Sequence, residues 1–324
     1  MEERNMNRYD FDSDYASAGL TLNQYVSRTF GWMFVGLMIT FALAAVIAAT
    51  GTVIFLFFIP GIQYILLIAE VAVVLIMSTN VQKRSVGTTR TLFMVYSLLN
   101  GLVFSFYFIV FDVVNLLFIF ALTALFFGGF ALYGRFTKTD LSRLGPLLVG
   151  GLIFLVIAGL LSLFINFTAM ERVICMVGIV VFLCFTAYDT QKIKANYEYF
   201  YGDEETLQKA SIFSALELYL DFINLFLYLL RFFGKNSRRS AERKTRLHGS
   251  RVFRKIKTPP KGRVIFACEV SVYTQRSLGT VVSPAKINSS ISTGTAWMTF
   301  IVITSSLMLL YIIATSWRFV KGFL

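Results

Sequence analysis

The feature that most constrains this chain is a series of apolar runs, each about as long as a bilayer is thick. Seven such runs lie at 30–50, 53–78, 91–111, 113–133, 146–166, 170–190 and 211–233. Crossing about 30 Å of hydrocarbon takes about 20 helical residues. Inside lipid the backbone must satisfy its own hydrogen bonds, as a helix does. The sequence therefore predicts an all-α integral membrane protein.

Composition agrees with this class and argues against several functions. Hydrophobic residues make up 56% of the chain and the mean hydropathy is +0.69. The one histidine, His248, lies outside the seven runs, so a Ser-His or Cys-His mechanism within the membrane lacks its base. We expect no enzyme activity and no cofactor. The net charge of +12 is local, because 14 of the 30 Lys and Arg lie in 234–296, so we expect no nucleic-acid partner.

The apolar runs and the change in composition after them divide the chain into four parts. Residues 1–29 read as a cytosolic arm, and 30–234 as a seven-helix membrane domain with short connections. Residues 235–296 form a basic tail that we expect to be poorly ordered, and 297–316 are a candidate eighth span.

Loop charge predicts the orientation. Alternate connections carry the basic residues, which are Lys83, Arg84 and Arg90, then Arg135, Lys138 and Arg143, then Lys192, Lys194 and Lys209. The connections between them carry few charges. Because cytosolic loops are enriched in Lys and Arg, these loops and the N-terminus are expected in the cytosol.

The seventh run conflicts with that rule, since a full crossing puts the basic tail outside. Three explanations remain open. The seventh segment is re-entrant, or a long basic loop crosses and 297–316 brings the chain back, or the tail is foreign to the membrane domain. We favour the third, because the tail is rich in Ser, Thr and Gly and lacks periodicity.

Charged residues within the seventh run indicate a functional face. Placed at 100° per residue, its polar residues fall within about 80° of the helix wheel. They are Glu217, Asp221, Asn224, Tyr228 and Arg231. An ionisable residue near the centre of a membrane helix costs about 2.5 to 3.5 kcal/mol, so this face should meet protein or water. It forms either an ion or proton site, or a polar contact that only holds helices together.

Two further acids are candidates. Asp189 ends the sixth run, where it could pair with Lys192 or serve a site, and Glu70 lies deep in the second run and needs a partner. Two acids facing one cavity do not both ionise easily, so they favour a shared proton, which Ca²⁺ can replace. Lys83 or Arg84 could latch one acid as a salt bridge.

Four segments in order carry a resemblance to a known family. They are Leu99–Leu102 (LNGL), Thr137–Ser142 (TKTDLS), Tyr188–Lys192 (YDTQK) and Leu218–Arg231 (LYLDFINLFLYLLR). Together they resemble the Bax inhibitor family of transmembrane proteins, over about residues 20–234. The resemblance implies a seven-helix bundle with the last helix central, wrapped by the other six. The family pattern ends soon after the seventh helix, so Asn236–Leu324 is not covered.

The resemblance also implies a function. It implies that the protein is a pH-sensitive calcium leak channel. The aspartate pair of the family corresponds to Asp189 and Asp221 in this sequence, and a basic residue after the second span would latch one of them as a salt bridge. Calcium ions and protons would then be the ligands, and the protein would lie in a bacterial plasma membrane. The alternative is a non-conducting interaction protein that modulates a membrane-bound protease or a cell-death or stress factor, with the acids only holding the fold.

Overall fold

The computed structural model describes residues 20–53, 55, 59, 61–79, 84–164, 170–256 and 301–313. These ranges contain helices and no strand. The helices are α2 (Leu22–Ala49), α4 (Ile62–Ser78), α5 (Val86–Val110), α6 (Val113–Phe136), the 3₁₀ helix η2 (Leu141–Leu144), α7 (Gly145–Phe164), α8 (Glu171–Tyr199), α9 (Glu204–Ile256) and a C-terminal helix (Ile301–Ile313). Six spans in this part of the chain are long and apolar enough to cross a membrane, and the shorter α4 and C-terminal helices are also apolar. The prediction of an all-α membrane protein is confirmed.

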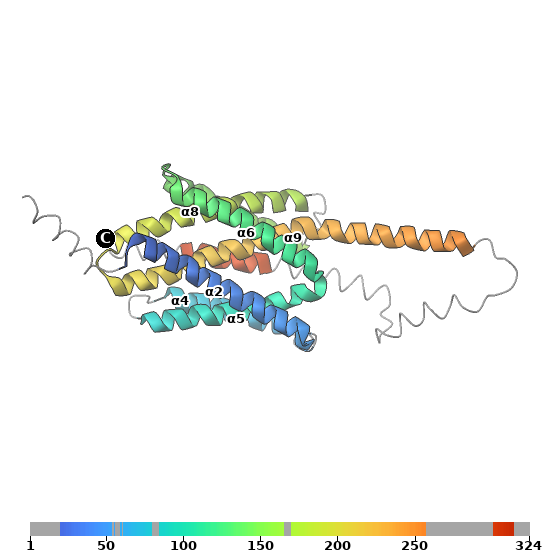
Figure 1. The fold of residues 1–324 in the computed structure, drawn as a ribbon, viewed down its shortest axis with the longest axis horizontal. Coiled ribbons are helices and arrows are strands. Elements are labelled where there is room, and N and C mark those ends of the chain that lie inside the picture. The colour runs from blue at the N-terminus through green and yellow to red at the C-terminus, as the bar shows by residue number, and fades with distance from the viewer. Residues whose placement is uncertain are drawn as a thin grey trace, which may run out of the picture.

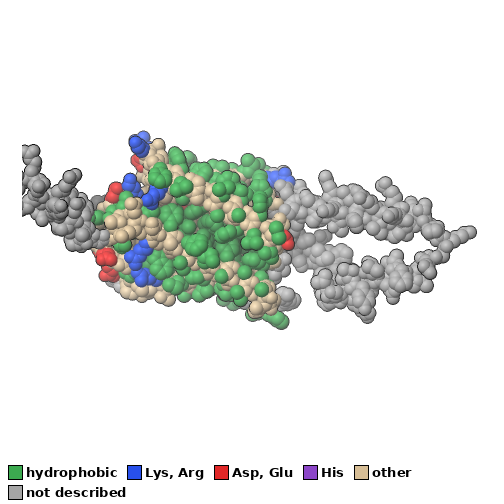
Figure 2. Space-filling model, in the orientation of Figure 1, with side chains coloured by type: hydrophobic (Ala, Val, Ile, Leu, Met, Phe, Trp, Pro, Cys, Tyr) green, Lys and Arg blue, Asp and Glu red, His purple; other side chains and the backbone are tan. Residues whose placement is uncertain are grey.

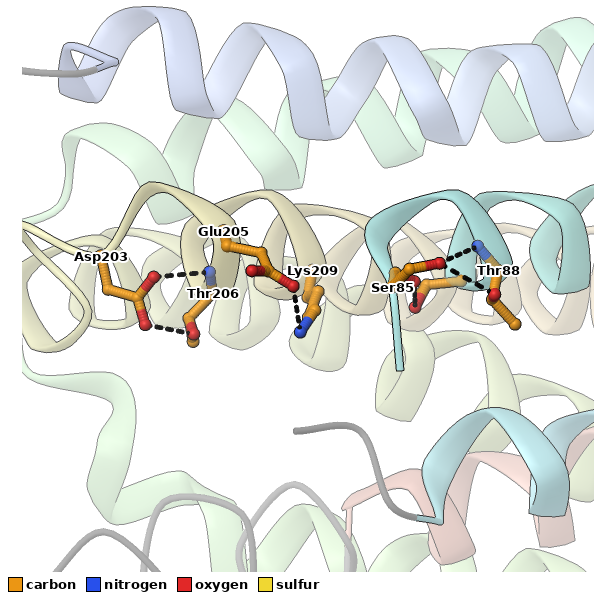
Figure 3. A network of polar contacts seen from close by, with 7 residues as sticks. Ser85, Thr88, Asp203, Glu205, Thr206 and Lys209 are labelled. Carbon is orange, nitrogen blue, oxygen red and sulfur yellow. Dashed lines mark hydrogen bonds and ion pairs between the residues drawn. The ribbon is translucent and has the colours of Figure 1, made fainter. Parts of the chain in front are cut away.

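Several helices begin where a side chain caps their first turn. Thr21 and Gln24 form a capping box at the start of α2, which begins inside the predicted N-terminal arm. Ser85 accepts a hydrogen bond from the Thr88 amide at 3.2 Å and starts α5 (Figure 3). In the second apolar run, Gly61 adopts a φ of 81° immediately before α4. Helix α4 therefore begins at Ile62, well inside the predicted second run 53–78.

Helix α9 begins at a carboxylate. Asp203 accepts hydrogen bonds from the amide and hydroxyl of Thr206, and Glu205 forms an ion pair with Lys209 one turn later (Figure 3). Those hydrogen bonds from Thr206 hold the pKa of Asp203 below its usual value. The carboxylate also lies at the positive end of the helix dipole, which favours the same ionised form.

Helix α9 is the most deeply buried of the candidate spans and lies among the other described helices (Figure 1). Ninety-four per cent of its most apolar stretch is buried inside the protein, against 22 to 50% in the other five candidate spans. It contacts α2, α5, α6 and α8. The outer surface of the protein has a broad hydrophobic belt, and its charged side chains gather toward the two ends (Figure 2). Residues such as Leu125 and Leu147, each 71% exposed, belong to the lipid-facing surface.

Close approach of α6 to α8 depends on one glycine. A Cβ on Gly134 would lie 2.2 Å from the carbonyl oxygen of Ala187, two residues before Asp189. Gly128 and Gly129 on the same helix differ, since a Cβ on either meets no atom within 4 Å. Neither of the two lies against another helix, whereas Gly134, five residues after Gly129, lies against α8. This glycine therefore lets the backbones of α6 and α8 approach closely two residues before Asp189.

We expect Gly134→Ala to destabilise the protein by about 1 to 3 kcal/mol, because the added methyl group overpacks a backbone contact. Gly129→Ala, on the same helix, should be neutral or slightly stabilising, since alanine favours helix by up to about 1 kcal/mol. The thermal midpoint of the detergent-solubilised protein measures both. Equal midpoints for the two variants would contradict the close α6–α8 approach.

The structure also bears on the tail. Helix α9 runs without interruption from Glu204 to Ile256, past the predicted boundary at 234, and shows no re-entrant turn. The C-terminal helix, within the candidate eighth span, packs into the bundle. Residues 1–19 of the predicted arm and 257–296 of the tail lie outside the described residues.

Candidate functional site

The candidate site is a pair of carboxyl groups between α8 and α9. Asp189 is 2% exposed and Asp221 is fully buried. The two side chains lie within hydrogen-bonding reach of each other. Within the described part of the chain no N–H or O–H donor reaches any of their four oxygens. The oxygens can therefore satisfy each other only when one carboxyl carries a proton.

The rest of the polar face of α9 follows the predicted stripe and meets α8 at both ends. Glu217 binds Lys192 Nζ through Oε1 at 2.8 Å. Arg231 lies 3.7 Å from Glu171. The prediction that this face meets protein is confirmed for these residues, and α8 supplies both partners.

Lys192 was a possible partner of Asp189, but its ammonium binds Glu217 instead. It still lies close enough to Asp189 to act on it electrostatically. The charges of Asp189, Glu217 and Lys192 likewise act on the Asp221 carboxyl. Three carboxyls and one ammonium thus share this region, and the formal charge is negative unless protons or cations enter.

Asn224 lies one turn beyond Asp221 and is fully buried. Its Nδ2 donates to the Leu220 carbonyl at 2.9 Å. Its Oδ1 accepts from Ser306 Oγ of the C-terminal helix at 3.5 Å. This side chain therefore joins the stripe to a segment that the sequence pattern treats as a separate tail.

Glu70 does not join the aspartate pair. It is buried in α4, and its charge acts on the phenol groups of Tyr96, Tyr107 and Tyr219. Its Oε1 has no hydrogen-bond partner among the described residues. The expectation that a mid-span acid needs a partner is not met by any ion pair in this part of the structure.

The basic latch is not formed by Arg84. Its Nε donates to the Thr79 carbonyl at 3.2 Å, at the exposed end of α4, and no described contact joins it to either aspartate. Lys83, the other candidate, lies outside the described residues. Among the described residues, Lys192 is the cation that acts on both aspartates.

The quoted segments TKTDLS and YDTQK contact each other next to Asp189, and LNGL lies in the contact between α5 and α2. Gln191 donates to the Thr139 carbonyl and accepts from the Leu141 amide, both at 2.8 Å, so it ties α8 to the loop after α6. A Cβ on Gly101 would come within 3.0 Å of the Thr40 carbonyl, so this residue lets α5 approach α2.

Sequence reasoning missed a hydroxyl network on another face of α9. Tyr219 and Thr40 share a hydrogen bond of 2.7 Å, and the Thr40 hydroxyl also lies 3.0 Å from the Ser97 carbonyl. The three residues come from α9, α2 and α5. Nothing in the spacing of a threonine and a tyrosine 179 residues apart indicates that they meet.

Metal binding by a resident cluster finds no support in the described residues, which contain no group of three or more His, Cys, Asp and Glu able to hold an ion. Ca²⁺ takes six to eight oxygen ligands. Two carboxyls suit a passing or weakly held cation better than a permanent one.

Comparison with known proteins places this arrangement in a family. The family model "Inhibitor of apoptosis-promoting Bax1" matches residues 22–238. The chain is 41% identical to the inner membrane protein YbhL of Escherichia coli over 231 residues, which cover 71% of this chain and 99% of YbhL. It is 34% identical to an uncharacterized protein of Borreliella burgdorferi over 217 residues, 67% of this chain and 94% of that protein.

An uncharacterized protein of Rickettsia prowazekii, RP147, is 35% identical over 213 residues, 66% of this chain and 90% of RP147. The family match covers the described helices from α2 to the buried part of α9, including the aspartate pair. The chain is a membrane protein that belongs to the Bax inhibitor family.

Proposed function

We propose that the protein is a pH-sensitive leak for Ca²⁺, with the path following the contact between α8 and α9 and the Asp189–Asp221 pair acting as its switch. Seven spans, α2 and α4 to α9, would surround this path, with α9 at the centre. The observation that carries the proposal is the pair itself. Two fully buried carboxyls face each other, with no donor for their four oxygens in the described part of the chain.

The chemistry is an exchange of a proton for a cation. At low pH one proton bridges the two carboxyls, and the pair has little attraction for a divalent ion. As pH rises the proton leaves, both carboxyls become negative, and a cation of charge +2 balances them. Proton and Ca²⁺ thus compete for the same oxygens, and the protein is proposed to conduct passively and to catalyse no reaction.

The proposed membrane is the bacterial plasma membrane, with the N-terminus in the cytosol. Supporting contacts place the start of α2 and two basic connections at one end of the bundle. Arg135 donates to Asn23, and both Arg28 and Arg90 donate to Gln208. Since cytosolic loops are rich in Lys and Arg, this end should face the cytosol.

Cysteine labelling checks the orientation in intact bacteria. In a variant without native cysteines, Ser142→Cys, in the exposed connection after α6, should resist an impermeant thiol reagent. Thr52→Cys, at the far end of α2, should react, because about 28 helical residues at 1.5 Å each separate the two ends. The reverse pattern would invert the proposed topology.

The proposed function is tested by Ca²⁺ entry into liposomes that contain the purified full chain and a calcium-sensitive dye. We expect entry that depends on protein and changes with pH between about 6 and about 8. Empty liposomes give the lower limit of Ca²⁺ entry, and liposomes treated with an ionophore give the upper limit. A protein that inserts correctly, judged by labelling, and admits no Ca²⁺ at any pH would refute the proposal and leave an interaction protein as the better account.

A further inference from the structure

The C-terminal helix lies outside the family match, which ends at residue 238, and yet it is buried. Nine of its side chains are at most 7% exposed, which are Ile301, Val302, Ile303, Thr304, Ser305, Ser306, Met308, Leu309 and Ile312. Leu307 is the exposed one, at 48%. A helix covered on nearly every side is enclosed by protein and does not lie on the surface of the bundle.

Three helices of the family domain contact it. On α7, a Cβ on Gly159 would lie 2.7 Å from Ile303 Cγ1, so the two helices approach closely there. On α5, the Tyr96 hydroxyl donates to Met308 Sδ at 3.3 Å. On α9, Ser306 reaches Asn224 at 3.5 Å. Figure 1 shows this helix beside α9, with the family domain around it.

The C-terminal helix contacts α9 close to the aspartate pair, at Asn224. Asn224 follows Asp221 by three residues on the same face of α9, so the Ser306 contact lies about 4.5 Å further along the helix axis. Thr304, Ser305 and Ser306 bring hydroxyl groups to this depth, and all three are buried. The C-terminal helix thus covers the polar stripe immediately beyond the acids.

Two observations indicate that the helix is an addition that can leave. YbhL is matched over 99% of its length by 231 residues of this chain, so the family domain is complete in that relative without a counterpart. Two polar contacts between this helix and the family domain are also weak, one with a sulfur acceptor at 3.3 Å and one between a hydroxyl and an amide at 3.5 Å. The buried Ser305 hydroxyl has no hydrogen-bond partner among the described residues.

We propose that residues 301–313 are a built-in plug, which packs against α5, α7 and α9 and closes the polar stripe beside Asn224 to water and cations. The inference rests on the proposed leak for its effect on Ca²⁺. Its structural part, the closure of the stripe, does not depend on conduction. The plug is tethered to α9, so it can leave and return without leaving the molecule.

The first test measures water access directly in the full chain. Asn224→Cys is introduced after Cys175, Cys184 and Cys268 have been replaced by alanine, and a small charged thiol reagent is applied to the protein in nanodiscs. Adding Gly159→Leu wedges α7 away from Ile303 and should speed labelling about tenfold or more, because the open state is a minor one in the parent. Gly150→Leu on the same helix should have no effect, since a Cβ there meets no atom within 4 Å.

A second pair of variants leaves the family domain untouched. Ile303→Ala with Leu309→Ala removes packing from the plug itself and should also speed labelling of Asn224→Cys. Leu307→Ala, at the exposed position, is the matched control. Unchanged labelling in both Gly159→Leu and the Ile303/Leu309 variant, with the protein folded, would overturn the plug.

An engineered disulfide distinguishes the plug proposal from the leak proposal. Oxidation of Asn224→Cys with Ser306→Cys should lock the helix in place and lower Ca²⁺ entry into liposomes, and reduction should restore it. If no variant conducts but displaced variants label faster, the plug holds and the proposed leak fails. If the parent conducts and neither locking nor displacement changes labelling or flux, the leak holds and the plug is refuted.

Discussion

Replacement of Asp221 by asparagine is expected to flatten the dependence of Ca²⁺ entry on pH. The parent should change its rate several-fold between about pH 6 and about pH 8, and the variant should change by less than about twofold. Asparagine keeps the shape of the side chain and removes the proton exchange. Its amide can also donate to Asp189, whose oxygens have no donor from the described residues of the parent. The pair then carries one ionised group at most.

The matched control is Asp112→Asn. Asp112 is an exposed acid at the start of α6, far from the pair in the chain, and its replacement removes the same charge. It should leave the pH profile intact. If Asp221→Asn and the parent titrate alike in liposomes, the aspartate switch is wrong for this protein, whatever the size of the leak.

The second large effect is expected at the ion pair next to the acids. Lys192→Met should destabilise the protein by about 3 kcal/mol, because it leaves the Glu217 carboxylate buried without its partner. The Glu217 side chain is 4% exposed and the Lys192 side chain 19%. The thermal midpoint in detergent should fall.

Glu217→Gln in the Lys192→Met background should recover most of that loss, since it removes the unpaired charge. Lys194→Met is the control, because Lys194 lies on the same helix and is exposed. A Lys192→Met protein as stable as the Lys194→Met protein would show that the buried pair contributes nothing to the contact between α8 and α9.

The sequence predicts the class of fold and the polar face of α9 well, because both follow from periodicity. Apolar runs mark the helices, and the 3.6-residue period places Glu217, Asp221 and Arg231 on one stripe. Helix starts are harder, since α2 begins at Leu22 through the Thr21 capping box and not at the first apolar residue. Caps lie in polar sequence, where the hydrophobic pattern has no information.

The sequence does not specify which side chains of different helices contact each other across the bundle. Lys192 and Glu217 are 25 residues apart, and their pairing depends on how α8 turns into α9. Gly134 and Gly128 look alike in sequence, yet only Gly134 among these lies against another backbone in the described structure. The C-terminal helix is the strongest case, because it follows the basic tail 235–296 in the chain and its burial shows that it packs into the bundle.

The central claim, that Asp189 and Asp221 share a proton that leaves as pH rises, is tested most directly by infrared difference spectroscopy of the purified full chain. The account predicts a carbonyl band of a protonated carboxylic acid at low pH that disappears as pH rises and that Ca²⁺ removes at a lower pH. The band should be absent in the Asp189→Asn/Asp221→Asn double variant. A band that persists unchanged in that variant, or a parent spectrum in which both carboxyls stay ionised at low pH, would contradict it.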